Sequence, residues 1–252
     1  MDLSIWAIVL LAVAGFVAGA LNAAAGGGSL VSFPALIAVG YSPLVANVTN
    51  NVAVFPGYVT GAIGYREGLR GQGRRILPLA IASTVGSLIG VGLILASSQA
   101  VFEGIVPFLI LAACALLAAQ PALGRWLGGG SGPRDRPGVG ALVGQTLVAV
   151  YGGYFSAALG VGILAILGLF FDDTLQRLNA LKALLQVIIG GAAALGFALL
   201  TSVAWIPIAV IGVASLAGGQ VGARLAQRVS DRILRIGIIA YGVAAAIWLF
   251  IR

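Results

Sequence analysis

The chain has 252 residues, of which 60% are hydrophobic and only 8% are charged, and its mean hydropathy is +1.10. Soluble domains carry about 25% charged residues, so this composition predicts instead an all-α polytopic membrane protein. The formal net charge of +7 is typical of short basic loops at one membrane face, and we expect no nucleic-acid partner. Histidine is absent and cysteine occurs once. We therefore expect no disulfide, no metal site and no cofactor.

The first apolar run, from Leu3 to Val39, carries no charged residue. A bilayer core about 30 Å thick takes roughly 20 helical residues, so this run is too long for one straight crossing. Three consecutive glycines, Gly26, Gly27 and Gly28, interrupt its second half. Broken backbone at membrane depth is tolerated only where it is buried in protein or lines a cavity. The run therefore predicts a helical hairpin, either re-entrant or crossing twice.

Three further spans complete the first half of the chain. Apolar runs predict them at about 44–65, 76–95 and 105–119. A segment rich in Gly, Pro and Arg, from Gly124 to Pro137, then divides the chain nearly in half. We interpret residues 1–121 as a first membrane repeat, 122–137 as a cytoplasmic linker and 138–252 as a second repeat, all within one integral membrane domain.

The second half repeats the pattern of the first. Ser156 pairs with Asn22, which sets the segment Gly160-Val161-Gly162 opposite the three glycines of the first half. Further along, the matched pairs are Asn50 with Asn179, Gly61 with Gly190, and Pro78 with Pro207. Each repeat is therefore expected to hold one glycine-broken helical hairpin and three plain transmembrane helices.

Loop charges predict how these repeats are oriented. The basic segments 66–75, 125–136, 177–182 and 224–235 are expected in the cytoplasm, and the uncharged connections 40–43, 97–100 and 201–204 outside. Matched loops of the two halves then lie on opposite sides, so the repeats are expected to be inverted. Inverted repeats around broken helices are the architecture of secondary transporters, whose substrate binds near the midplane between the repeats.

The glycine breaks are the first candidate site. Helices that start near Ser29 and Ile163 would point free N–H groups, and the positive end of the helix dipole, at the membrane centre. Such a terminus binds anions. The alternative is that the glycines only allow close helix packing. Because the break is duplicated, we prefer the site interpretation.

Polar side chains within the spans are the second candidate. Asn47, Thr49, Asn50 and Asn51 cluster in the second span; their amides and hydroxyl could replace an anion's water, or they cap a helix end at the outer interface. Lys182 is the sole lysine of the chain. It is a candidate counter-charge for the substrate, or it snorkels to the cytoplasmic surface.

The seven acidic residues are all assigned to the amino terminus, to loops or to span ends. Cation carriers and proton pumps usually bury a carboxylate or a histidine at membrane depth. The absence of acidic residues from the middle of the apolar runs therefore predicts an anionic substrate. Nothing resembles a nucleophile–base pair or a phosphate-binding loop, so we do not expect an enzyme.

Several motifs in this order resemble the sulfite exporter TauE/SafE family. They are Gly19-x8-Gly28 with Pro34, then Ala46-x2-Thr49-Asn50, and the tail Gly218-Gly-Gln-Val-Gly222-Ala-Arg224-Leu followed by Arg232-x-Leu-Arg235-x-Gly237. The resemblance implies a multi-pass permease of the bacterial inner membrane with two related halves. It also implies substrates such as sulfite, thiosulfate, sulfoacetate and other organosulfonates. The second break departs from the first because Val161 replaces the middle glycine, which puts equal use of the two hairpins in doubt.

We therefore expect a permease that moves a small, sulfur-containing anion by alternating access, with that anion and the lipid bilayer as its partners. The expected substrate-binding residues are Asn22, Gly26, Gly27, Gly28, Ser29, Ser32, Asn47, Thr49, Asn50, Asn51, Ser156, Gly160, Gly162, Asn179, Lys182 and Gln186. An anion channel and a non-transporting assembly subunit are the alternatives. The sequence leaves open the anion, the direction, the coupling ion and the oligomeric state.

Overall fold

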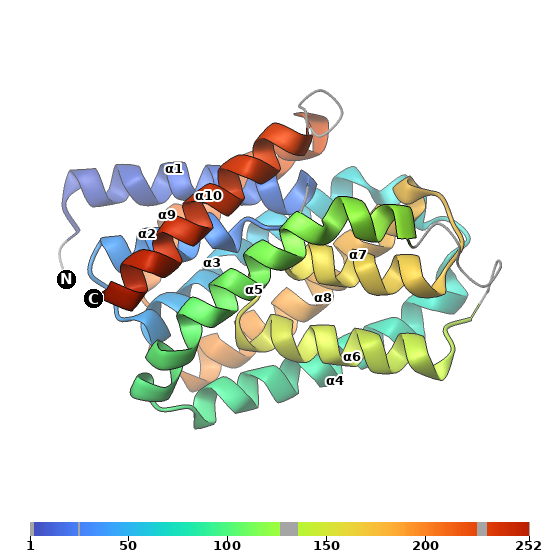
Figure 1. Cartoon of the computed structure of the whole chain (residues 1–252), viewed down its shortest axis with the longest axis horizontal. Helices are drawn as coiled ribbons and strands as arrows, with labels where there is room; N and C mark the ends of the chain where they lie inside the picture. Colours follow the sequence, from blue (N-terminus) through green and yellow to red (C-terminus); the bar gives the residue numbers. More distant parts are fainter. Residues whose placement is uncertain (1–2, 25, 127–135, 226–230, 252) are drawn as a thin grey trace.

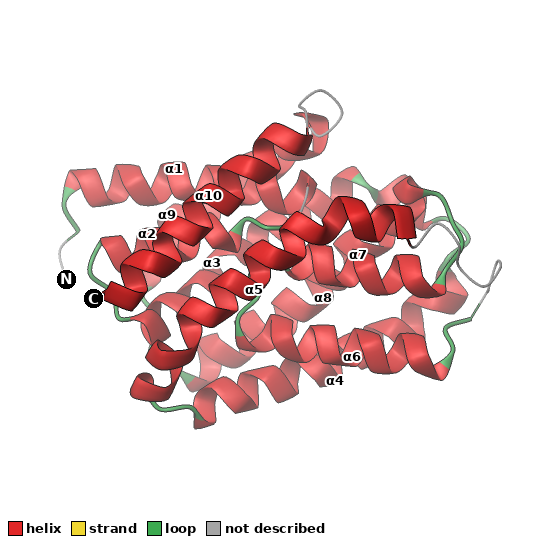
Figure 2. Ribbon diagram, in the orientation of Figure 1, coloured by secondary structure: helices red, strands yellow, loops and turns green. Residues whose placement is uncertain are grey.

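The structure is a computed structural model, and it describes residues 3–24, 26–126, 136–225 and 231–251. Within these residues every regular element is a helix (Figure 2). In chain order they are α1 (Ile5–Ala24), α2 (Ser29–Ala38), α3 (Pro43–Gly64), the 3-10 helix η1 (Arg66–Leu69), α4 (Gly73–Ala96), α5 (Gln99–Trp126), α6 (Val139–Tyr154), α7 (Leu159–Phe170), α8 (Leu175–Leu200), α9 (Trp205–Leu225) and α10 (Asp231–Ile251).

The helices present apolar side chains to the outside and polar ones to the inside. Among the described helices, α1, α4, α5, α8 and α9 are long and apolar enough to cross a membrane. On α4, Leu77 and Ile81 are 66% and 57% exposed, whereas Ser83 and Ser87 are fully buried. An apolar exterior around a polar interior is the arrangement expected in lipid.

Two short helices, α2 and α7, fold back on the helices that precede them. The hairpin of α1 and α2 opens toward the end of the molecule where both termini lie (Figure 1). The hairpin of α6 and α7 opens toward the opposite end, and both turns lie inside the bundle. Each hairpin therefore returns to the end of the molecule from which it starts.

The hairpins are packed across the two halves of the chain. Helix α1 packs mainly against α9, and α6 packs mainly against α4. Glycines make both approaches close: a Cβ on Gly15 would lie 2.8 Å from the Cα of Ile211, and one on Gly90 would lie 2.8 Å from the backbone nitrogen of Tyr154. Small residues at helix crossings are the usual means of close packing in membranes. The two halves are consequently intertwined in one helix bundle.

Two helices begin earlier than the apolar runs indicate, because polar side chains cap them. The Ser98 hydroxyl accepts a hydrogen bond from the N–H of Val101 at 3.3 Å, so that Glu103 lies inside α5 rather than in a connection. The Thr174 hydroxyl accepts from the N–H of Arg177 at 3.4 Å, so the basic segment 177–182 is helical and not a loop. Helix α5 also takes in the first residues of the expected linker. Parts of two other expected basic loops, 127–135 and 226–230, lie outside the described residues.

Candidate substrate site

The first break joins α1 to α2 and keeps its shape through two hydrogen bonds. The N–H of Gly26 donates to the carbonyl of Leu21 at 2.8 Å, and Gly26 has a φ of +84°. Glycine adopts this left-handed conformation without strain and commonly ends a helix with it. The side-chain oxygen of Asn22 accepts from the N–H of Gly28 at 2.8 Å. Helix α2 then starts at Ser29, as expected.

The second break does not lie where its glycines indicate. Helix α7 begins at Leu159, so Gly160 and Gly162 are helical and the expected start near Ile163 is wrong. The backbone turns instead at Ser156 and Ala158, whose φ values are 62° and 54°.

Hydrogen bonds explain why non-glycine residues hold this turn. The N–H of Ser156 donates to the carbonyl of Tyr151, five residues back, just as Gly26 donates to Leu21. The Tyr151 hydroxyl also donates to the carbonyl of Ala157 at 2.7 Å. By this pattern Ser156 occupies the place of Gly26 and not that of Asn22, with which it aligns in sequence.

The two breaks touch each other. A Cβ on Gly26 would lie 2.5 Å from the Cα of Gly160, and a Cβ on Gly160 would lie 2.7 Å from the Cα of Gly26. The hydroxyls of Ser29 and Ser156 are 3.4 Å apart. Gly160 is therefore required for a backbone-to-backbone contact and not for a turn. Two other predicted glycines meet side chains instead: Gly27 faces Leu117, and Gly162 faces Val148 and Leu116.

Asparagines of helix α3 form hydrogen bonds with both hairpins. The Ser32 hydroxyl of α2 donates to the side-chain oxygen of Asn50 at 2.5 Å. The amide of Asn47 donates to the carbonyl of Tyr154, at the end of α6, at 2.8 Å. Asn51 donates to the carbonyl of Asn47 at 3.1 Å. All three asparagines are buried, so this cluster is internal and does not cap a helix end at the surface.

Two predicted site residues, Thr49 and Asn179, form no hydrogen bond with the breaks in the described part of the chain. The Thr49 hydroxyl accepts from the N–H of Ala204, just before α9, at 3.2 Å. Asn179 is only half-buried, unlike its sequence counterpart Asn50. Thr49 thus stabilises the start of a helix rather than the hairpin contact.

Helix α8 contributes a buried cation and a buried amide. Lys182 and Gln186 are 1% and 2% exposed, and a spacing of four residues places them on one helix face. A Cβ on Gly160 would lie 3.1 Å from the Gln186 amide, so Gln186 lies at the contact between the breaks. Lys182 is buried and does not reach the surface, and no carboxylate of the described residues pairs with it. An unpaired ammonium is costly to bury.

Four buried donor groups in this region lack a hydrogen-bond acceptor among the described residues. They are the side-chain nitrogens of Asn22, Asn50 and Gln186 and the hydroxyl of Tyr58. The Tyr58 hydroxyl lies near those of Ser29 and Ser156 but forms no hydrogen bond of acceptable geometry with either. Buried polar groups are nearly always paired in folded proteins. A set of unpaired donors is therefore suited to a ligand rich in acceptor oxygens.

Tyr58 is a candidate site residue that the sequence did not single out. It follows Asn50 on α3 by eight residues, which is two turns along one helix face. Its ring lies against Gly190 of α8, where a Cβ would lie 2.7 Å from the ring carbon Cδ2. The helical periodicity running from Asn50 is the signal that would have found it.

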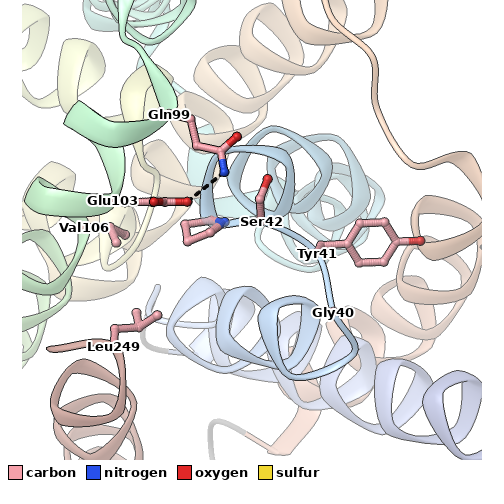
Figure 3. A pocket seen from close by; sticks show the side chains of 8 residues that line it. Gly40, Tyr41, Ser42, Gln99, Glu103, Val106 and Leu249 are labelled. Atoms are coloured by element: carbon pink, nitrogen blue, oxygen red, sulfur yellow. Dashed lines mark hydrogen bonds between the residues drawn. The ribbon is translucent and has the colours of Figure 1, made fainter. Parts of the chain in front are cut away.

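The central residues lie between two cavities at opposite ends of α3. One cavity, of about 480 Å³, adjoins the start of α3 and contains Glu103, which accepts a hydrogen bond from Gln99 at 2.8 Å (Figure 3). The other, of about 420 Å³, lies beyond the end of α3 and contains Arg74, Arg75 and Arg177. Because the residues between them are buried, the centre is closed toward both ends.

Comparison with known proteins identifies the family. Residues 11–249 match the family described as Sulfite exporter TauE/SafE. The chain belongs to this family. The TauE/SafE family and its apolar helices make the chain a multi-pass membrane transporter.

Relatives of this TauE/SafE chain carry the same general description. It is 28% identical over 251 residues to the probable membrane transporter protein ORF9 of Sinorhizobium sp, with 98% of this chain and 93% of the relative covered. It is 28% identical over 243 residues to the probable membrane transporter protein YfcA of Escherichia coli, covering 92% and 86%. A probable membrane transporter protein of Haemophilus influenzae is 34% identical over 124 residues, 49% of each chain.

Proposed function

We propose that this TauE/SafE member is a secondary transporter of a small sulfur oxyanion, such as sulfite, thiosulfate or an organosulfonate, in the bacterial inner membrane. The substrate binds where the two hairpin breaks meet. Lys182 supplies the counter-charge, and neutral donors from α1, α3 and α8 take the oxygens. Sulfur oxyanions carry acceptor oxygens and no hydrogen-bond donors beyond a single O–H, which matches this lining.

The unpaired donors carry this proposal. Asn22, Asn50, Tyr58 and Gln186 each bury a donor without an acceptor among the described residues, and Lys182 buries a charge without a carboxylate. Leaving a buried donor unpaired costs about 1–3 kcal/mol, and more for a charged group. A bound anion would relieve all of these costs together. A cation would worsen them, so the substrate is an anion.

The arrangement of the hairpins supports an inverted repeat and alternating access. The hairpins open toward opposite ends of the molecule (Figure 1). The packing of α1 against α9 also corresponds to the packing of α6 against α4, with the two repeats exchanged. The closed centre between two end cavities suits an occluded state. Rocking one repeat, together with the hairpin of the other repeat that is packed on it, would then open the site to one side at a time. By the positive-inside bias, the arginine-lined end faces the cytoplasm.

Uptake into proteoliposomes tests the proposal. Purified protein is reconstituted into liposomes, and the initial uptake of radiolabelled sulfite, thiosulfate and sulfoacetate is measured. Protein-free liposomes are the blank, and uptake of potassium is the cation control. We expect saturable uptake of at least one of these anions and none of the cation. No uptake of any anion would contradict the proposal.

A further inference from the structure

The arginine-lined cavity lies outside the central site. Its volume is about 420 Å³, and the residues that line it are Gly71, Gly73, Arg74, Arg75 and Arg177. A Cβ on Gly71 or Gly73 would meet no atom within 4 Å, so bare backbone borders the cavity on that side. Its lining residues thus carry three guanidinium groups and no carboxylate. Guanidinium groups bind oxyanions by paired, charge-assisted hydrogen bonds.

Two of these arginines share one carboxylate. Asp173, just before α8, accepts from Arg75 at 2.6 Å and from Arg177 at 2.9 Å. Arg75 is 7% exposed and also lies over the ring of Phe171, 4.9 Å from its centroid. Arg75 is therefore a fixed wall of the cavity. Arg177, whose side chain is 36% exposed, and the exposed Arg74 are the arginines that an entering anion reaches first.

Close contacts between η1 and α8 separate the cavity from Lys182. The Gln72 amide donates to the carbonyls of Gly68 and Arg177, at 2.7 and 3.0 Å. Gly68 lies so close to Ala180 that a Cβ on it would be 2.7 Å from the Ala180 Cβ. Arg177 precedes Lys182 by five residues, or about 7.5 Å along the helix axis. The cavity is thus a separate compartment beside the central site.

We propose that Arg74, Arg75 and Arg177 form a second anion site, which takes a small tetrahedral oxyanion of sulfur or phosphorus at the basic end of the protein. The anion competes with Asp173 for the guanidinium groups. This site goes beyond the transport proposed above, because it rests on residues that the central site does not use. A free oxyanion and an anionic lipid headgroup share this chemistry.

Equilibrium binding of radiolabelled sulfate tests the second site. The full chain is placed in nanodiscs of phosphatidylcholine and titrated at low, constant ionic strength. The test variant is Arg74→Gln with Arg177→Gln, and the matched control is Arg66→Gln with Arg70→Gln. The control removes two exposed arginine side chains that do not line the cavity, and it keeps the Arg70 carbonyl that accepts from Arg177 at 3.0 Å. Arg75 is left unchanged because its side chain is buried and lies over the ring of Phe171.

We expect sulfate binding to weaken about tenfold or more in the test variant, since each charge-assisted contact is worth roughly a factor of ten. The matched control should bind like the wild type. Asp173→Asn should tighten binding several-fold because it removes the competing carboxylate. Equal affinity in the test variant and the matched control, or no saturable binding in the wild type, would overturn the proposal, even where transport is intact.

A second arm identifies the source of the oxyanion. The titration is repeated in nanodiscs that contain phosphatidylglycerol. Unchanged sulfate binding supports a site for free anions. Displacement of sulfate by the lipid, lost in the Arg74→Gln, Arg177→Gln variant, supports the same site with a headgroup phosphate as its occupant.

Discussion

At the scale of single residues, the centre of this transporter is defined by donors without acceptors. Lys182 is the one buried lysine, and the groups around it are amides and hydroxyls. A single positive charge with neutral donors suits an anion that must later leave, because neutral donors release their ligand to water more readily than further fixed charges would. Substitutions can therefore test the positive charge of Lys182 separately from the neutral groups that bind the oxygens.

Replacing the charge tests its role as the substrate's counter-ion. Lys182→Gln should lower the transport efficiency about 10- to 100-fold, because a hydrogen bond to a charged group contributes about 1.5–3 kcal/mol. Lys182→Arg should retain part of the activity. Initial uptake rates over a range of anion concentrations measure both. Since the wild-type ammonium is unpaired, Lys182→Gln should not lower the thermal unfolding temperature; a variant that unfolds earlier and transports normally would contradict the assignment.

Substitution of Tyr58 should change transport and stability in opposite directions. Its buried hydroxyl has no acceptor among the described residues, so Tyr58→Phe should stabilise the folded protein by about 1 kcal/mol. The same change should reduce transport efficiency about 3- to 10-fold, because one neutral hydrogen bond to the anion is lost. A thermal scan and an uptake assay on one preparation check both. Lower stability with unchanged transport would assign Tyr58 to packing alone.

The glycines of the first break offer a matched pair. Gly26→Ala places a side chain at a φ of +84° and against the backbone of Gly160, so it should cost at least about 1–2 kcal/mol and abolish most transport. Gly27→Ala meets only the Leu117 side chain, at 3.6 Å, and should be tolerated. Unfolding temperature and uptake distinguish them. Similar behaviour of the two variants would show that the contact between the breaks is not needed.

At the scale of elements, sequence patterns predicted the hairpins but not both of their turns. The first turn follows the glycines, because Gly26 ends α1 by its own left-handed conformation. In the second, hydrogen bonds from Tyr151 and Ser156 hold the turn, which leaves Gly160 for the contact between hairpins. Local propensity cannot distinguish a glycine that turns from one that packs. Similarly, Thr49 lies in the predicted cluster but caps α9, a tertiary contact that no local pattern encodes.

The link between α7 and α8 predicts a pH dependence. Burial alone would raise the pKa of Asp173, but hydrogen bonds from Arg75, Arg177 and the Thr174 N–H hold it below its usual 3.8. A lowered folded-state pKa stabilises the protein fully above pH 3.8, and this stabilisation is lost as the pH falls through the lowered value. Asp173→Asn should therefore cost about 1.5–3 kcal/mol at neutral pH.

Unfolding temperatures at several pH values measure this effect. The difference between wild type and Asp173→Asn should be constant from pH 7 to pH 5 and should shrink below pH 3.8. The exposed neighbour Asp172 supplies the control, and Asp172→Asn should change little. A difference that persists undiminished at the lowest pH would contradict the role of the Asp173 charge.

At the scale of the whole molecule, the intertwining of the two halves limits how the site can open. Helix α1 is packed on α9 and α6 on α4, so neither half can move without a hairpin of the other. The hairpin contact at Gly26 and Gly160 lies where these two packed units meet. Rocking about that contact would expose the centre to one end cavity at a time, which is the requirement of a carrier.

Exchange across the membrane tests this account most directly. Proteoliposomes are loaded with unlabelled anion or with buffer, and the initial entry of the same radiolabelled anion is measured. We predict that internal anion accelerates entry, that entry saturates with external concentration, and that Lys182→Gln loses both properties. Entry that rises linearly and is indifferent to internal anion, or that is identical in Lys182→Gln, would contradict an alternating-access anion site at the contact between the two hairpins.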